Sequence, residues 1–256
     1  MEDLGTLGGE YSFALAINDK GQVVGDSETG FWEQHPFLWS QGQMMDLGTL
    51  GGYYGSATDI NERGQVVGVS LNASGEYHAF LWKKGEMIDL GTLGGAYSEA
   101  SAINERGEIV GFSTNSQGNS RPFLWRNGTM KDLGTLGGNF GDANSINDWG
   151  EIVGGTATSQ NEPRPTRWFQ RNIEDLGIYP GYSVDPNDVN NSGSITGFYY
   201  QTVYDIHCFL LQDAVSIDIG NLGANYCVAW SINDTGFIAG TSATVDEQGH
   251  AFLWMP

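Results

Sequence analysis

Three carboxylates stand at equal distances along the chain. Glu99, Asp142 and Asp185 are separated by steps of 43 residues, so they would share one place in a repeated fold. Carboxylate oxygens gathered around one point could bind Ca²⁺ or another hard cation. A closely spaced pair could instead act in acid/base catalysis, because burial and like charge raise the pKa of one member. A solvated acidic lining without a ligand is the third interpretation.

A second position, two residues further along each copy, varies together with the first. Side chains two residues apart on a strand point the same way, so both positions should face one space. The first position carries Phe13, Ser56, Glu99, Asp142, Asp185 and Val228, and the second carries Leu15, Thr58, Ser101, Asn144, Asn187 and Trp230. Convergent polar groups in an apolar cavity are typical of small-molecule sites, so we predict a ligand site made of Glu99, Asp142, Asp185, Asn144, Asn187, Trp230 and Phe13.

The same step of 43 residues runs through the whole chain. It separates six aspartates and six asparagines, without an insertion: Asp3, Asp46, Asp89, Asp132, Asp175 and Asp218, and Asn18, Asn61, Asn104, Asn147, Asn190 and Asn233. A period near 40 to 45 residues, filled with short apolar runs, is typical of a β-propeller blade. The sequence therefore predicts one all-β domain over residues 1–256, a six-bladed β-propeller whose repeats start near those six aspartates.

Each copy is expected to form a four-stranded antiparallel meander. In the second copy we predict strands at residues 54–60, 65–69, 78–82 and 87–90, a turn at 61–64, and a crossing to the next blade at 91–95. Asn and Gly suit the turn because both tolerate positive φ. Alanine at the centre of the first strand fits the crowded axis, and Phe-Leu-Trp in the third strand fills the widening space between blades.

The two ends of the chain are expected to close the ring. Residues 2–5 read as a fourth strand and residues 252–254 as a third strand. The N-terminal strand would therefore complete the last blade and remove the free sheet edges.

The repeated motifs resemble those of the HAF-repeat family. They are Asp-Leu-Gly-Thr-Leu-Gly-Gly, then Ile-Asn-x-x-Gly-x-Val-Val-Gly, then His-Ala-Phe-Leu-Trp, and His78 and His250 begin the last motif in its intact form. The resemblance covers the whole chain and implies an extracellular or periplasmic bacterial propeller. It implies no particular activity. The motifs depart from the pattern in copies four to six, as at Gly177-Ile-Tyr-Pro-Gly181.

The crossings and the variable loops between second and third strands should share one face, where we expect the site. Aromatic residues repeat beside this mouth and could stack on sugar rings or pack under the crossings: Tyr54, Tyr97, Phe140 and Tyr226. The loop at residues 26–34, with Phe31 and Trp32 exposed, could alternatively hold a protein partner.

Histidine or arginine occupies one position near the start of the third strand in all six copies: His35, His78, Arg121, Arg164, His207 and His250. We expect these side chains to donate hydrogen bonds to carbonyls of the neighbouring crossing. The two cysteines, Cys208 and Cys227, are expected to be small buried thiols, because two cysteines make no disulfide framework.

The charge balance excludes several partners. The chain has 31 acidic and 11 basic residues, a net charge of −20. Such a surface repels phosphate backbones and anionic lipid, which argues against nucleic acid and membranes. No stretch of about 20 apolar residues is present, and no signal peptide is visible. We expect a monomer without a cofactor, with Ca²⁺ left open as a ligand.

Together these features favour a non-enzymatic binding or scaffolding propeller. Its ligand would be a glycan or another small polar molecule, with or without a cation, at the central mouth on the loop-bearing face. One alternative is a hydrolase or lyase that uses Glu99, Asp142 and Asp185. The other alternative is a scaffold for protein–protein interactions.

Overall fold

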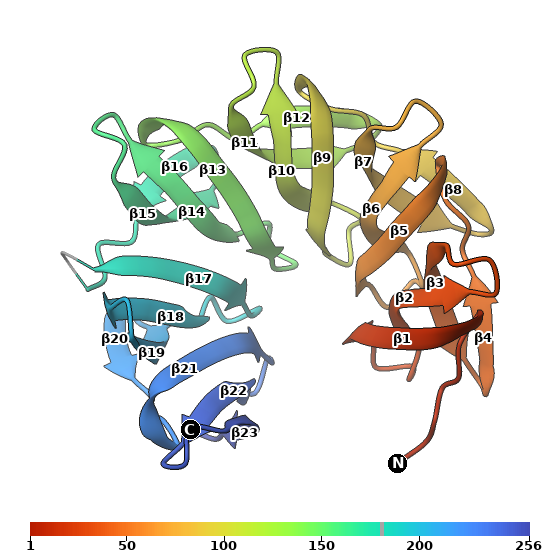
Figure 1. Ribbon diagram of the computed structural model, residues 1–256. Coiled ribbons are helices and arrows are strands. Elements are labelled where there is room, and N and C mark those ends of the chain that lie inside the picture. Colours follow the sequence, from red (N-terminus) through yellow and green to blue (C-terminus); the bar gives the residue numbers. More distant parts are fainter. Residues whose placement is uncertain (180–181) are drawn as a thin grey trace. The chain divides into compact units, whose positions relative to one another are not determined.

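The computed structural model describes residues 1–179 and 182–256, and these residues form strands and turns with no helix. Among them, accordingly, there is no helix long and apolar enough to cross a bilayer. The chain divides into two compact units, Met1–Leu133 (unit 1) and Gly134–Pro256 (unit 2). Each unit contains three copies of the repeat (Figure 1). The single domain over residues 1–256 stays a prediction.

Unit 1 holds three complete four-stranded repeats. Each is an antiparallel meander in chain order, as predicted. The strands are β1 (Gly8–Ile17), β2 (Val23–Thr29), β3 (Gln34–Ser40) and β4 (Gln43–Asp46), then β5 (Gly51–Ile60), β6 (Val66–Asn72), β7 (Tyr77–Lys83) and β8 (Glu86–Asp89), then β9 (Gly94–Ile103), β10 (Ile109–Asn115), β11 (Ser120–Arg126) and β12 (Thr129–Asp132).

Unit 2 holds two four-stranded repeats and a three-stranded one. The strands are β13 (Gly137–Ile146), β14 (Ile152–Thr158), β15 (Pro163–Phe169) and β16 (Asn172–Asp175), then β17 (Ser183–Val189), β18 (Ile195–Thr202), β19 (Asp205–Gln212) and β20 (Val215–Asp218), then β21 (Gly223–Ile232), β22 (Ile238–Thr244) and β23 (Gly249–Trp254). The predicted strands of the second copy are confirmed, and the main difference is that β5 starts at Gly51, three residues earlier than expected.

Neighbouring repeats pack through apolar residues and a short parallel contact. In unit 1, β3 meets β5 at Gln34 and Tyr54, and β7 meets β9 at Tyr77 and Tyr97. The phenylalanine of the third strand is buried in four repeats, at Phe37, Phe80, Phe123 and Phe209. The predicted packing role of the Phe-Leu-Trp runs is thus confirmed for Phe37, Phe80 and Phe123, and Phe209, in a Phe-Leu-Leu run, is buried likewise.

The first two strands of a repeat approach so closely that only small residues fit between them. Ala57 is fully buried and lies opposite Gly68. A Cβ atom on Gly68 would lie 2.0 Å from the carbonyl oxygen of Ser56. The glycine recurs every 43 residues because a side chain there would collide with backbone.

A bulge follows this contact in each first strand. Ala57 pairs with Gly68 and Asp59 pairs with Val67, so Thr58 is an extra residue on the first strand. Such a residue is left out of the pairing, and its side chain is turned in a new direction. The same irregularity places Asn144 and Asn187 at the bulge in β13 and β17.

The turn asparagines form Asx turns and also connect repeats. The Oδ1 atom of Asn61 accepts hydrogen bonds from the backbone N–H groups of Arg63 and Gln65, both at 3.1 Å. Its Nδ2 donates to the carbonyl oxygen of Asn104, 43 residues further on, at 3.1 Å. Each turn is therefore tied to the equivalent turn of the next repeat within the unit.

The histidines and arginines at the start of the third strand contact a carboxylate rather than the predicted carbonyls. His35 Nδ1 lies 2.9 Å from an oxygen of Asp46, which accepts the N–H of Gly48 in the crossing. His78, Arg121, Arg164 and His207 make the equivalent contact with Asp89, Asp132, Asp175 and Asp218. The aspartate is the link between this side chain and the crossing.

The prediction of free thiols is wrong, because Cys208 and Cys227 form a disulfide. The bond joins β19 to β21 across the boundary between two repeats. The equivalent residues of unit 1 are Ala79 and Ser98, where the N–H of Ala79 donates to Ser98 Oγ at 2.9 Å. The cysteines thus replace a hydrogen bond by a covalent one. A buried disulfide of this kind indicates an oxidising compartment.

The N-terminal strand was expected at residues 2–5. In the equivalent positions of complete repeats, the fourth strand ends at the aspartate, as β4 does at Asp46. Residues 1–6 are not assigned to a strand within unit 1. The pairing of these residues with the last repeat stays a prediction.

The disulfide generates a test. We expect a Cys208→Ala, Cys227→Ser variant to fold, because it recreates the Ala79–Ser98 pair of unit 1. The cysteines are 19 residues apart, and loss of a crosslink closing a loop of that length lowers the free energy of unfolding by about 3 kcal/mol. Urea unfolding should show this loss, and reductant should lower the stability of the wild type but not of the variant. Equal stability of the oxidised and reduced wild type would contradict the assignment.

Candidate ligand-binding site

The structure separates the seven predicted site residues into two sets. Phe13 and Glu99 belong to unit 1, and Asp142, Asn144, Asp185, Asn187 and Trp230 belong to unit 2. The assembly of all seven around one mouth stays a prediction.

The side chains of Asn144 and Asn187 do not point in the same direction as the carboxylates of Asp142 and Asp185. Asn144 Nδ2 donates to the carbonyl oxygen of Pro186 at 2.9 Å, and Asn187 Nδ2 donates to that of Ala229 at 2.7 Å. The expected alternation of side chains fails because each asparagine is the extra residue of a bulge. These amides join neighbouring repeats, as Thr58 does in unit 1.

Asp142 and Asp185 lie close enough to influence each other. Burial raises the pKa of Asp142, although the carboxylate accepts a hydrogen bond from the N–H of Gly155 at 3.0 Å. Burial, and then the negative charge of Asp142, raise the pKa of Asp185 to about 6. The two residues are therefore an acidic pair in which both carboxyl groups have a raised pKa.

Glu99 is held by a tyrosine. Its carboxylate accepts a hydrogen bond from the Tyr97 hydroxyl at 2.6 Å. Burial, together with this bond, raises the pKa of Tyr97. The Tyr97 ring stacks on Phe112, with ring centroids 5.4 Å apart. Tyr97 thus has the packing role that was one of its two expected functions.

The described residues provide no set of three or more His, Cys, Asp or Glu side chains placed to hold a metal ion. The Ca²⁺ hypothesis therefore has no ligand set in this part of the chain.

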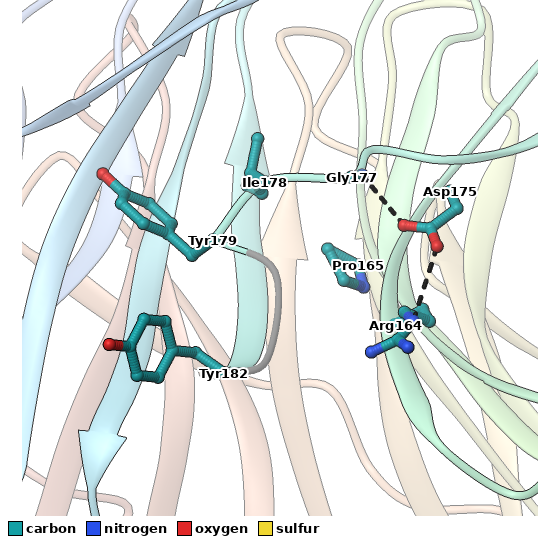
Figure 2. Close-up of a pocket in the computed structure, with 7 residues that line it drawn as sticks. All are labelled: Arg164, Pro165, Asp175, Gly177, Ile178, Tyr179 and Tyr182. Atoms are coloured by element: carbon teal, nitrogen blue, oxygen red, sulfur yellow. Dashed lines mark hydrogen bonds and ion pairs between the residues drawn. The ribbon is translucent and has the colours of Figure 1, made fainter.

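One cavity of unit 2 lies at the irregular crossing between its first two repeats. It has a volume of about 190 Å³ and is lined on one side by Arg164 and Asp175. Figure 2 shows that the rings of Tyr179 and Tyr182 point away from Arg164. Tyr179 stacks on Tyr199 at 3.9 Å, and Arg164 pairs with Glu162 as well as Asp175. The charged groups of this cavity are already paired within the protein.

A larger cavity of unit 2, about 350 Å³, surrounds Arg167. This arginine stands where other repeats have leucine, such as Leu38 in the core of unit 1. It makes ion pairs with Glu151 at 3.2 Å and with Glu174 at 2.5 Å. The guanidinium is thus neutralised inside the protein.

A pocket in the first repeat is lined by exposed aromatic residues. This blade-one pocket has a volume of about 120 Å³ and draws on β1, β2, β3 and the loop between β2 and β3. Its lining consists of three aromatic residues, three carboxylates and one amide: Tyr11, Phe13, Trp32, Asp26, Glu28, Glu33 and Gln34. Of the predicted site residues, it contains only Phe13.

The aromatic residues of the blade-one pocket remain accessible. Tyr11, Phe13 and Trp32 are 58%, 61% and 77% exposed. The residue equivalent to Tyr11 in the second repeat is Tyr54, which packs against Tyr77 with centroids 5.6 Å apart. The first repeat thus leaves open an aromatic position that the second repeat uses for packing.

Trp32 stands in a backbone conformation that suits glycine. Its φ is 63°, and the equivalent loop residues of the next two repeats are Gly75 and Gly118, with φ of 83° and 79°. All three donate the same turn hydrogen bond, which runs from Trp32 N to Thr29 O at 3.2 Å. A bulky residue in the left-handed region is strained, and such strain collects at functional sites.

Asp26 forms the buried floor of the pocket. It is 6% exposed, and it accepts hydrogen bonds from Ser56 Oγ at 2.7 Å and from Gln34 Nε2. Glu28 accepts the backbone N–H of Glu10 at 2.7 Å. These donors are neutral, so none of these hydrogen bonds pairs the carboxylates with a cationic side chain.

Sequence reasoning had named the loop at residues 26–34 only as a surface for a protein partner. One signal in the sequence pointed further, a tryptophan at a position held by glycine in the next two repeats. The pairing of Asp26 with Phe13 is visible only in the structure. The position of Tyr11 beside that loop depends on the path of the chain into β1, which is set by tertiary structure and not by local sequence.

No protein-family model and no curated protein sequence matches the chain. Solved structures of β-propellers match almost its whole length at 9–11% identity. The propeller domain of the Trilobed protease from Pyrococcus furiosus has a TM-score of 0.68, with 95% of this chain and 78% of that chain covered, at 10% identity.

Two further matches have different activities. A six-bladed lectin of Aleuria aurantia, described by its mode of fucose recognition, has a TM-score of 0.50 at 11% identity, with 95% of this chain and 92% of that chain covered. A gluconolactonase of Xanthomonas campestris has a TM-score of 0.53 at 9% identity, with 98% and 89% covered. At these identities the matches show the fold alone. The chain has the six-bladed β-propeller fold that its repeat predicted.

The acidic pair generates a prediction about pH. The pKa of Asp185 is about 6 in the folded chain and 3.8 for a free side chain, so folding favours its protonated form. The wild type should therefore lose stability as pH rises from about 4 through 6. We expect Asp185→Asn to raise the free energy of unfolding at pH 8 by on the order of 2 kcal/mol, with no difference at pH 3.5.

Urea unfolding at several pH values measures this effect, and Asp246→Asn, at an exposed position, controls for net charge. A gain that is the same at every pH, or that the control variant reproduces, would contradict the raised pKa.

Proposed function

We propose that this chain is a glycan-binding propeller and that the blade-one pocket holds a sugar residue. The observation that carries the proposal is the combination of three exposed aromatic rings with carboxylates in one small cavity. A sugar ring has an apolar face of C–H groups and a rim of hydroxyl groups. The aromatic faces suit the C–H groups, and carboxylates accept strong hydrogen bonds from hydroxyl groups.

The size of the pocket fits a weak, single-residue site. A pocket of about 120 Å³ has room for no more than one sugar residue. At about −0.3 kcal/mol per non-hydrogen atom, a monosaccharide of about 12 such atoms would bind with a Kd in the millimolar range. Multivalent display of the sugar would raise the apparent affinity.

The lectin of Aleuria aurantia supports the proposal only at the level of the fold. It demonstrates that a six-bladed propeller of this type can recognise a sugar, in that case fucose. The sugar for this chain is to be inferred from its own pocket.

We also infer membership of the HAF-repeat family and an extracellular or periplasmic location. The repeated Asp-Leu-Gly-Thr-Leu-Gly-Gly and His-Ala-Phe motifs support the family. The Cys208–Cys227 disulfide supports the location, because disulfides persist in oxidising compartments.

The rival proposals rest on fewer groups. A hydrolase or lyase would depend on Asp142 and Asp185, since Glu99 is engaged by Tyr97 and belongs to the other unit. A protein-interaction scaffold would use the same loop as the sugar, with Phe31 at 85% exposure as its anchor.

Substitution of Trp32 tests the proposal. Trp32→Gly removes one aromatic wall of the pocket. It also gives the loop the glycine that the next two repeats have at this position. The fold should therefore be retained, with a free energy of unfolding that is unchanged or higher by about 1 kcal/mol. We expect the variant to lose binding on an array of multivalent glycans. Phe31→Ser is the matched control, because Phe31 is exposed beside the pocket but does not line it. Equal glycan binding by Trp32→Gly and the wild type would refute the proposal.

A further inference from the structure

The lining of the blade-one pocket is anionic. Asp26, Glu28 and Glu33 contribute carboxylates, whereas no lysine or arginine lines the pocket. His35 lies outside the lining, with its Nε2 3.5 Å from Glu33. A neutral sugar would leave this negative charge uncompensated in a confined space.

The buried carboxylate is the most informative of the three. Asp26 has neutral hydrogen-bond donors, Ser56 and Gln34, and it makes no ion pair with any described lysine, arginine or histidine. Buried charges in proteins are usually paired, because desolvation of an isolated charge costs free energy. A cationic group of the ligand above Asp26 would supply the missing partner.

The aromatic walls favour the same kind of ligand. The faces of tryptophan and tyrosine rings carry partial negative charge and attract ammonium groups within about 6 Å. The pocket thus combines two features that attract cations, and it presents no donor with a full positive charge that would select an anionic sugar.

The charge of the whole chain acts in the same direction. With a net charge of −20, the protein attracts cationic polymers over a longer range and repels acidic ones. The negative charge of the whole surface attracts any cation, whereas the pocket would select a ligand that also fits its aromatic walls.

We propose that the ligand of the blade-one pocket is an amino sugar with a protonated amine, as in a glucosamine oligosaccharide. This inference rests on the proposed glycan-binding function and names its substrate class. The ammonium group would lie over Asp26 and near Glu33, and the sugar ring would lie against Trp32 and Phe13.

Glu33 offers a matched pair of variants. Its equivalent in the second repeat is Glu76, which contacts His78 at 3.7 Å as Glu33 contacts His35. Both carboxylates are about half exposed, but only Glu33 lines the pocket. Both substitutions therefore remove a carboxylate that contacts a histidine of the third strand. Only Glu33→Gln removes it from the pocket, so Glu76→Gln is the control.

The experiment measures binding of glucosamine tetrasaccharide and of its N-acetylated counterpart by calorimetry. The wild type should bind the amino form about tenfold more tightly, and salt should weaken only that form. Glu33→Gln should weaken binding of the amino form about fivefold and change binding of the N-acetylated form less than twofold. Glu76→Gln should leave both affinities unchanged, and Trp32→Gly should abolish binding of both.

The outcomes separate the two proposals. If the N-acetylated form binds as tightly as the amino form and Trp32→Gly abolishes that binding, the glycan site stands and the amino-sugar inference is wrong. If the amino form binds but Glu33→Gln behaves like Glu76→Gln, the attraction comes from the whole surface and the inference is also wrong. If neither these sugars nor any glycan of the array binds, both proposals fail.

Discussion

The hydrogen bond between turn asparagines of successive repeats is the constraint on which the rest of the fold depends. In unit 1 it runs from Asn18 to the carbonyl of Asn61, and in unit 2 from Asn147 to that of Asn190. The same side chain also closes its own turn, so one residue fixes both the local turn and the distance to the next repeat. The same bond recurs between asparagines 43 residues apart in both units.

The residues that differ between copies act within this frame in two ways. At the bulge, Asn144 and Asn187 strengthen the contact between repeats rather than face a ligand. In the first repeat, Trp32 keeps the turn of the next two repeats but replaces their glycine by an exposed ring. Tyr11 is exposed where the equivalent Tyr54 packs against Tyr77. A residue that differs between copies therefore indicates a ligand site only where its side chain lacks the contacts that the equivalent residues make in other copies.

The sequence was sufficient for the fold and for much of the architecture of a repeat, because the Asn, Gly and Phe-Leu-Trp positions each have one strong physical reason. It was insufficient for the disulfide, since Cys208 and Cys227 occupy different positions of two repeats and meet only through the parallel contact of β19 with β21. It was also insufficient for the bulge, which depends on strand register. The blade-one pocket brings residues from three strands and a loop together, and only Phe13 was named in advance.

The most direct test of the account is the free energy of unfolding of Asn61→Asp compared with Asn72→Asp. Both asparagines accept turn hydrogen bonds through Oδ1, which aspartate retains, but only Asn61 donates to the next repeat. The account predicts a loss of about 2–4 kcal/mol for Asn61→Asp, because a buried carbonyl loses its donor and faces a carboxylate, and a loss below about 0.5 kcal/mol for Asn72→Asp. Equal losses in the two variants would contradict the claim that this bond holds neighbouring repeats together.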